Sequence, residues 1–129
     1  MNTALEGKVY PETRFTVDAT HVDRFARAVG ASGRAVPTTF ATAAEFASFP
    51  AIVGDPELRL DFARVVHADQ EYVFERPLRA GEALIVRSRI AAIRARGGRS
   101  FLTIETALVD ESGASVVVAR ATMLERPPA

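Results

Sequence analysis

The feature that most constrains this sequence is a regular two-residue alternation of apolar and polar side chains over its C-terminal half, beginning near Asp69. Such a period is typical of β-strands with one buried face. Turn signals interrupt it at 77–81, at Gly97-Gly98 and at 110–113. The glycine pair is a strong hairpin signal, because tight hairpin turns require positive φ angles. We therefore predict an antiparallel meander of about four strands from Asp69 onward.

The first third of the chain has a helical period instead. A short alternating strand is predicted at 14–17, followed by a helix that Asp18 or Thr20 caps and that Gly30 and Gly33 end. Its apolar face would consist of Val22, Phe25, Ala26 and Val29.

A second, alanine-rich helix is predicted from Ala41 to Phe49, with Thr38 or Thr39 as its cap and a break at Pro50. Glu45 is the only charged residue of this stretch, which indicates a helix buried on most sides. One antiparallel sheet wrapped around one apolar helix is the economical solution for this order of elements. We expect an α+β hot-dog fold, with residues 1–129 forming a single domain.

Composition excludes several classes of function. Sixteen basic and sixteen acidic residues cancel, which argues against nucleic-acid binding. No apolar run is long enough to cross a membrane, and cysteine is absent, so disulfides and thiolate ligands are excluded. We expect a cytoplasmic protein without a metal or another cofactor.

Two histidines, His21 and His67, are the main candidates for acid–base chemistry. In the simpler interpretation, His21 lies in a solvated first helical turn and His67 begins a strand. Alternatively, either could serve as a base, with His67 facing a cavity near the central helix. The aspartates that could orient such a base are Asp18, Asp23, Asp61 and Asp69.

Five arginines gather around the predicted second hairpin: Arg87, Arg89, Arg94, Arg96 and Arg99. They form either the solvated face of an exposed strand or a surface for the phosphates of coenzyme A or for an acidic carrier protein.

The segment 66–84 reads VHADQEYVFERPLRAGEAL. It resembles the H-G-E-Q-x-[FY]-x-x-x-R-P-L-x-x-G-D-x-L stretch of MaoC-like dehydratases, particularly their N-terminal-domain branch. Residues 5–8 are similar to the opening of that branch, and residues 36–40 are similar to the A-P-x-T-F start of its central helix. The resemblance spans residues 5–125.

The resemblance implies a hot-dog fold, usually dimeric, that acts on acyl thioesters. Active members hydrate a trans-2-enoyl thioester with an aspartate and a histidine in a D-x-N-P-x-H motif. Neither histidine here follows an aspartate at that spacing, and the interval 30–36, where the motif would fall, is too short to hold it. We therefore assign no catalytic residue. The chain is similar to the non-catalytic subunit of mycobacterial-type (3R)-hydroxyacyl thioester dehydratases.

Two hypotheses follow. The chain is either the substrate-binding subunit of a two-chain enoyl-thioester hydratase or a catalytically inactive homodimeric module that binds acyl ligands. In both, the partners are an acyl thioester, carried by coenzyme A or a carrier protein, and a second hot-dog chain. The candidate substrate-binding residues are Pro37, Thr38, Thr39, Phe40, Thr42, Phe46, His67 and Tyr72. For each, plain core packing is the competing explanation.

Overall fold

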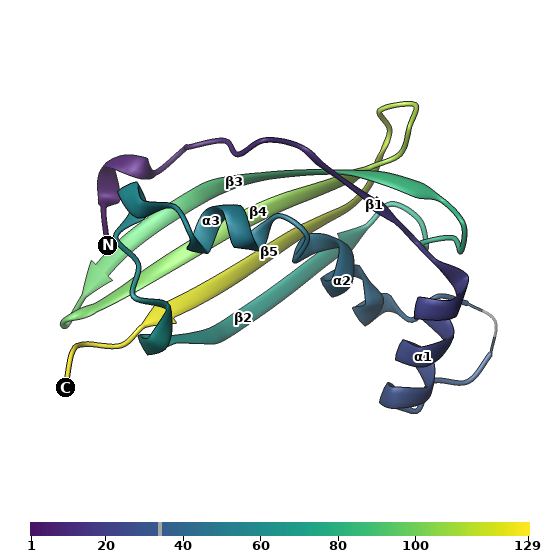
Figure 1. Cartoon of the computed structure of the whole chain (residues 1–129), viewed down its shortest axis with the longest axis horizontal. Coiled ribbons are helices and arrows are strands. Elements are labelled where there is room, and N and C mark those ends of the chain that lie inside the picture. The colour runs from purple at the N-terminus through teal and green to yellow at the C-terminus, as the bar shows by residue number, and fades with distance from the viewer. Residues whose placement is uncertain (34) are drawn as a thin grey trace.

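A computed structural model describes residues 1–33 and 35–129. Its centre is one five-stranded antiparallel sheet in the order β1-β3-β4-β5-β2. The strands are β1 (Thr13–Thr16), β2 (Val65–Phe74), β3 (Ala83–Arg96), β4 (Arg99–Val109) and β5 (Ser115–Glu125). Strands β3, β4 and β5 follow one another as a meander, and β2 lies at the sheet edge beside β5 (Figure 1).

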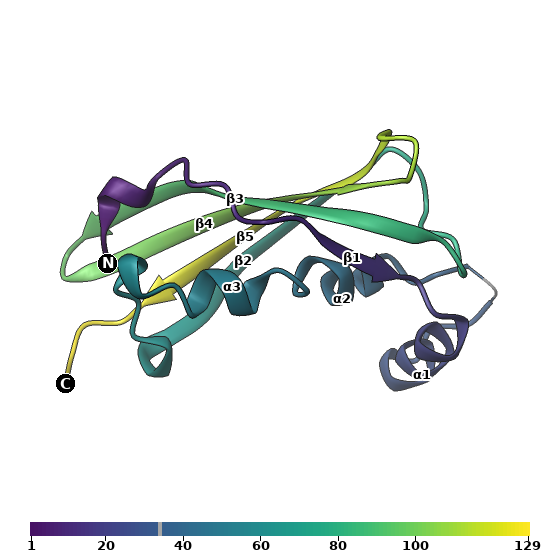
Figure 2. The ribbon, with the colours of Figure 1, turned by 45° about the horizontal axis from the view of Figure 1, so that its top comes forward.

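The helical segments are short. They are η1 (Thr3–Leu5), α1 (Ala19–Val29), η2 (Thr38–Phe40), α2 (Ala41–Glu45), α3 (Phe49–Val53), η3 (Pro56–Leu58) and η4 (Phe62–Arg64). Segments α2 and α3 run across one face of the sheet, and α1 lies at one end (Figure 2). No helix among the described residues combines the length and hydropathy needed to cross a membrane.

The predicted alternation on the strands is confirmed. On β4, Leu102, Ile104, Thr106 and Leu108 are buried, and the residues between them are partly exposed. The architecture is therefore the hot-dog arrangement that the sequence predicts. The predicted four-strand meander from Asp69 is wrong, because β2 begins at Val65 and pairs with β5 at the far edge instead of with β3.

The predicted first helix is confirmed in its position and its cap, but Val29, predicted on its apolar face, is 53% exposed because it lies in the last turn beyond the packed residues. The Asp18 carboxylate caps α1 by accepting a hydrogen bond from the backbone N–H of His21 at 3.0 Å. Gly30 ends the helix with φ 72°, a left-handed conformation that favours glycine. Arg34, within the short interval 30–36, lies outside the described residues.

The prediction of one continuous central helix is wrong, because a turn separates α2 from α3. The Ser48 hydroxyl donates to the carbonyl of Glu45 at 3.0 Å and contacts the Ser88 hydroxyl at 2.6 Å. Ser88 in turn contacts Thr106 at 2.8 Å, so a hydroxyl chain ties this turn to β3 and β4. A serine that bonds the backbone of the preceding turn competes with helix continuation.

Two local predictions about this helix are also wrong. Pro50 does not break the helix but lies in the first turn of α3, where its missing N–H costs nothing. Neither Thr38 nor Thr39 is a cap, because Pro37 precedes η2 and no side-chain cap is formed.

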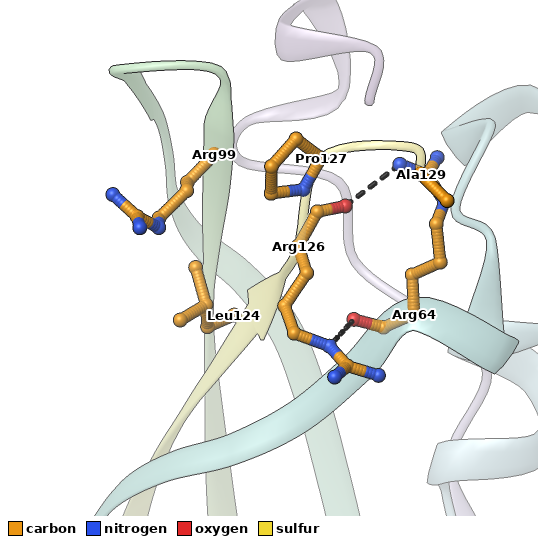
Figure 3. A pocket seen from close by; sticks show the side chains of 6 residues that line it. All are labelled: Arg64, Arg99, Leu124, Arg126, Pro127 and Ala129. Carbon is orange, nitrogen blue, oxygen red and sulfur yellow. Dashed lines mark hydrogen bonds between the residues drawn. The ribbon is translucent and has the colours of Figure 1, made fainter.

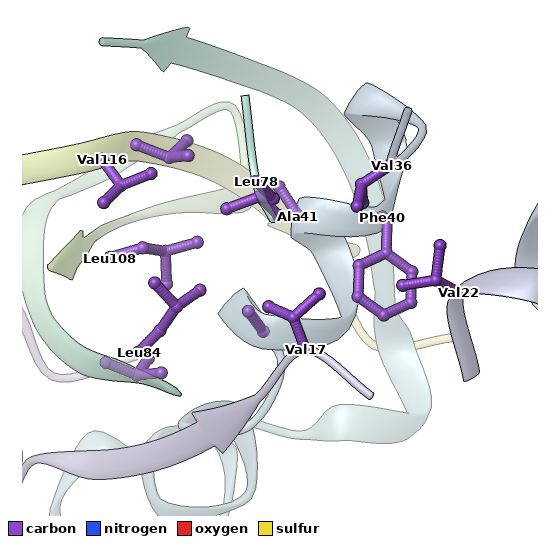
Figure 4. Close-up of a cluster of buried hydrophobic side chains, with 12 residues drawn as sticks. Val17, Val22, Val36, Phe40, Ala41, Leu78, Leu84, Leu108 and Val116 are labelled. Atoms are coloured by element: carbon purple, nitrogen blue, oxygen red, sulfur yellow. The ribbon is translucent and has the colours of Figure 1, made fainter. Parts of the chain in front are cut away.

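Buried apolar residues form two clusters, one on each side of the hydroxyl chain. The first surrounds Phe40 and Ala41 and includes Leu84 and Leu108 from the sheet (Figure 4). The second contains Ile52 from α3, with Ile90 and Ile104 from the sheet beside it.

Candidate functional site

The candidate site is the seam between the central helical segments and the edge strand β2. A β-bulge at Ala68 shifts the register of β2, and beyond it Gln70 and Tyr72 are half-buried while Glu71 is exposed. Six of the eight predicted binding residues lie along the seam: Pro37, Thr38, Thr42, Phe46, His67 and Tyr72.

One end of the seam is an apolar pocket of about 460 Å³. Its lining residues are Phe46, Phe49, Pro50, Val53, Phe62, Val65, His67 and Met123. The ring of Phe46 stacks on Phe49 with centroids 4.3 Å apart, and the ring centre of His67 lies 6.0 Å from that of Phe46. An apolar pocket of this size with one polar group at its wall suits the hydrocarbon part of a small ligand.

The opposite end of the seam is a groove of about 320 Å³. Its lining residues are Val36, Pro37, Thr38, Phe74, Glu75, Arg76, Pro77 and Leu78. Pro37 and Thr38 therefore lie at the seam, as the predicted ligand site requires, but at the end away from the apolar pocket.

A polar cluster fills the middle of the seam. Thr42 and Glu45 come from α2, and Gln70 and Tyr72 come from β2. The Gln70 side-chain amide donates to both Glu45 carboxylate oxygens, at 3.2 and 3.1 Å. The Tyr72 hydroxyl donates to the same carboxylate at 3.1 Å and makes a short hydrogen bond with the Thr42 hydroxyl.

Glu45 is 0% exposed, an unusual environment for a carboxylate. No lysine or arginine forms an ion pair with it in the part of the chain that the structure describes. Burial raises the pKa of Glu45, and the hydrogen bonds from Gln70 and Tyr72 oppose that rise. Burial likewise raises the pKa of Tyr72 to about 12, so its hydroxyl stays a donor near neutral pH.

Two predicted residues lie away from these hollows. Phe40 is completely buried in the first core cluster, with its ring centre 4.9 Å from His21 and 5.4 Å from Phe25. Core packing accounts for this residue. Thr39 is exposed and lines neither hollow.

The sequence analysis missed most of the apolar wall. The missed residues come from four elements, of which β5 lies far along the chain from the others, and no local pattern joins them: Phe49, Val53, Phe62, Val65 and Met123. Phe62 is 65% exposed at this wall, but nothing in the sequence around it indicates that exposure.

The histidines form no relocated catalytic pair among the described residues. His67 contacts the backbone carbonyl of Asp69 through Nε2 at 3.1 Å, not its carboxylate. His21 packs its ring against Phe40, and the Asp61 carboxylate binds Arg64. The described residues also contain no group of three potential metal ligands.

The arginines of the second hairpin mostly belong to a solvated, ion-paired surface. Arg87 pairs with Glu12 at 2.7 Å and Arg89 with Glu105 at 2.8 Å, and Arg94 pairs with Glu6.

Arg99 belongs instead to an open hollow of about 610 Å³ together with Arg64 and Arg126 (Figure 3). The Arg64 guanidinium is occupied by Asp61 and by Glu125, each at 2.9 Å. The side chain of Arg99 extends away from Arg126, so these cations do not converge on one point.

The fold is that of a hot-dog domain. Residues 13–119 match the FAS1-like dehydratase domain region, so the chain belongs to the FAS1-like, MaoC-type dehydratase family.

The chain also has relatives among the UPF0336 proteins. A UPF0336 protein of Streptomyces coelicolor is 34% identical and covers 98% of this chain and 95% of its own. That alignment counts 143 positions against 129 residues here, so the relative carries segments that this chain lacks.

Two solved structures are similar. The Mycobacterium tuberculosis HadBC complex, a (3R)-hydroxyacyl-ACP dehydratase, has a chain 25% identical with a TM-score of 0.76 that covers 93% of this chain and 96% of its own. A MaoC-like dehydratase shares the fold with a TM-score of 0.83 at 21% identity, covering 96% of this chain and 43% of the larger one.

Proposed function

We propose that this chain is the acyl-binding subunit of a two-chain (3R)-hydroxyacyl-thioester dehydratase that works in the cytoplasm. The observation that carries the proposal is the apolar pocket at the seam, which opens beside an unpaired sheet edge. A hydrocarbon tail fits its phenylalanine and valine walls, and burying each methylene there contributes about 0.8 kcal/mol.

The edge strand β2 supplies the docking site for the second chain. Its ten residues leave one row of backbone donors and acceptors outside the sheet, a template for strand addition. Val66 and Val73 on this strand are 40% and 52% exposed, which adds apolar area for a partner. The similarity to a chain of the HadBC complex supports a hot-dog partner.

The missing aspartate–histidine spacing supports a division of labour between the two chains. No imidazole hydrogen-bonds a carboxylate within residues 1–33 and 35–129, and the interval 30–36 has no room for the catalytic loop. The partner would then supply the base and acid for the addition of water, and this chain would hold the acyl tail.

The test is to recover the tagged chain with its partner from the native host and to measure dehydration rates against acyl length. With the partner, this chain should extend the accepted length, and Val53→Phe, which fills the pocket, should remove the gain. Val29→Phe on the exposed side of α1 is the matched control. If the partner alone processes long chains equally well, the proposal fails.

A second candidate is a homodimeric acyl-binding module without catalysis. It is favoured by the open edge of β2, along which a second copy of this chain can pair in the same way as a different hot-dog chain. Purification from the host as a homodimer that binds acyl-pantetheine with chain-length dependence would select this candidate. Recovery of a second hot-dog chain that carries the D-x-x-x-x-H spacing would eliminate it.

A further inference from the structure

One polar atom in the seam has no partner among the residues that the structure describes. The side-chain oxygen Oε1 of Gln70 is buried and accepts no hydrogen bond from residues 1–33 or 35–129, while Nε2 of the same amide is bound to Glu45. Buried acceptors are normally satisfied, so an orphan in a ligand seam calls for a donor that the free chain does not supply.

Glu45 fixes which end of this amide is the free one. An ionised carboxylate accepts hydrogen bonds only, so it holds the NH₂ group of Gln70 and leaves Oε1 as the unpaired end. The Tyr72 hydroxyl already donates to Glu45 and therefore does not serve Oε1. The cluster is one donor short.

The position of Gln70 connects this acceptor to the apolar pocket. Gln70 lines a hollow of about 380 Å³ together with His67, Ala68 and Asp69, and His67 also lines the apolar pocket. A ligand whose tail fills the apolar pocket and whose thioester end leaves it beside His67 would carry its oxygen-bearing carbons along the Gln70 side.

We propose that Gln70, oriented by Glu45, is a specificity-determining residue that accepts a hydrogen bond from the hydroxyl of a 3-hydroxyacyl ligand. The inference rests on the proposed acyl-binding function. An enoyl or saturated chain has no donor at that position, whereas a 3-hydroxyl group does. The hydrogen-bond donors of a pantetheine arm are the same in all these ligands, so their contribution cancels when the affinities of two ligands are compared.

The selectivity should depend on pH through Glu45. When Glu45 is protonated, a turn of the Gln70 amide lets Oε1 accept from the carboxyl O–H, and this bond competes with the ligand hydroxyl. Thr42, on the same helix, reaches the cluster through Tyr72, and Ser48 binds the Glu45 backbone carbonyl. His67 and Tyr72, both on β2, are the titratable groups that influence the carboxyl. Because burial raises the pKa of Glu45, the preference for hydroxylated ligands should grow with rising pH.

The test compares binding of S-octanoyl-pantetheine and S-(3-hydroxyoctanoyl)-pantetheine to the full chain by calorimetry, from about pH 5 to about pH 9. At alkaline pH the hydroxylated ligand should bind about tenfold tighter, the usual worth of one hydrogen bond that satisfies a buried group. Gln70→Met should remove the preference while octanoyl binding remains. Glu71→Gln, one residue along on the opposite face, is the matched control and should keep it.

Glu45→Gln keeps the proposal testable if Gln70→Met fails to fold. Its permanent amide donor satisfies Oε1 and should abolish both the preference and its pH dependence. Equal affinities for the two ligands in the unchanged chain, or a preference that survives Glu45→Gln, would overturn the inference and leave the acyl-binding function standing. If neither ligand binds, the acyl-binding function itself fails.

Discussion

Replacement of Glu45 by glutamine should stabilise the chain, and more so as the pH rises. Burial raises the pKa of Glu45 above its ordinary value of 4.5, so the folded state holds this proton more tightly than the unfolded state does. The stability linked to that proton is fully present below about pH 4.5 and is lost as the pH rises through the folded pKa. Glutamine does not titrate and avoids this loss.

The magnitude follows from the hydrogen bonds of the cluster. At a pH where Glu45 of the unchanged chain is ionised, the amide that Glu45→Gln introduces makes two hydrogen bonds in its place. Its NH₂ group would donate to the unpaired Oε1 of Gln70, and its oxygen would accept from Tyr72. Satisfying one buried acceptor and removing one buried charge together contribute about 1–3 kcal/mol. For 129 residues, 1 kcal/mol corresponds to roughly 4 °C in Tm. We expect Tm to rise by about 4–12 °C at pH 8 and to change little at pH 4.5.

Thermal unfolding followed by circular dichroism at several pH values measures this difference. Glu71→Gln, an exposed glutamate on the same strand as Gln70, is the control and should leave Tm nearly unchanged. A Tm difference between Glu45→Gln and the unchanged chain that stays constant from pH 4.5 to pH 8 would refute the reasoning. So would a loss of stability at pH 8, since it would mean that the carboxylate form stabilises the fold.

Three further substitutions test the packing around the site. Phe40→Ala removes a completely buried ring and should cost about 3–5 kcal/mol in urea unfolding; a cost below about 1 kcal/mol would contradict its place in the core. Gly54→Ala would set its Cβ 2.8 Å from the Pro50 carbonyl oxygen and should cost about 1–3 kcal/mol, measured in the same way. Hydrogen bonds from Lys8 and Tyr10 lower the pKa of Asp55, so the stability that Asp55 contributes is present above about pH 3.8 and is lost on acidification through its folded pKa. Asp55→Asn should flatten the acid limb of the stability curve.

The strands and the β3-β4-β5 meander could be predicted from the sequence because their signals are local, whereas the pairing of β2 with β5 joins segments far apart in the chain and could not. Each strand of the meander carries its own alternation, and Gly97-Gly98 and Asp110 to Gly113 mark the turns within a few residues. The Asp18 cap is equally local, since the carboxylate binds a backbone N–H only three residues on.

The break in the central helix could not be predicted in the same way. It depends on Ser48 meeting Ser88, forty residues away, and an alanine-rich stretch gives no local sign of that contact. Local sequence patterns do not predict the apolar pocket for the same reason, because Phe46 and Met123 are far apart in the chain and meet only in the folded sheet. One feature of the sequence does point to the polar cluster. Glu45 is the single charged residue of the apolar stretch 41–49.

The two predictions for Glu45→Gln have opposite directions, and this separates a functional carboxylate from a structural one. If the Glu45 carboxyl served only the fold, a substitution that satisfies Gln70 would improve stability and leave ligand preference untouched. If Glu45 is retained because its ionised form keeps one acceptor free for a ligand, the more stable variant loses discrimination. A carboxylate at 0% exposure that no lysine or arginine of the described residues pairs with is costly, even with hydrogen bonds from Gln70 and Tyr72, and such a cost persists where a function uses it. Measuring stability and selectivity on the same variant therefore decides which role Glu45 has.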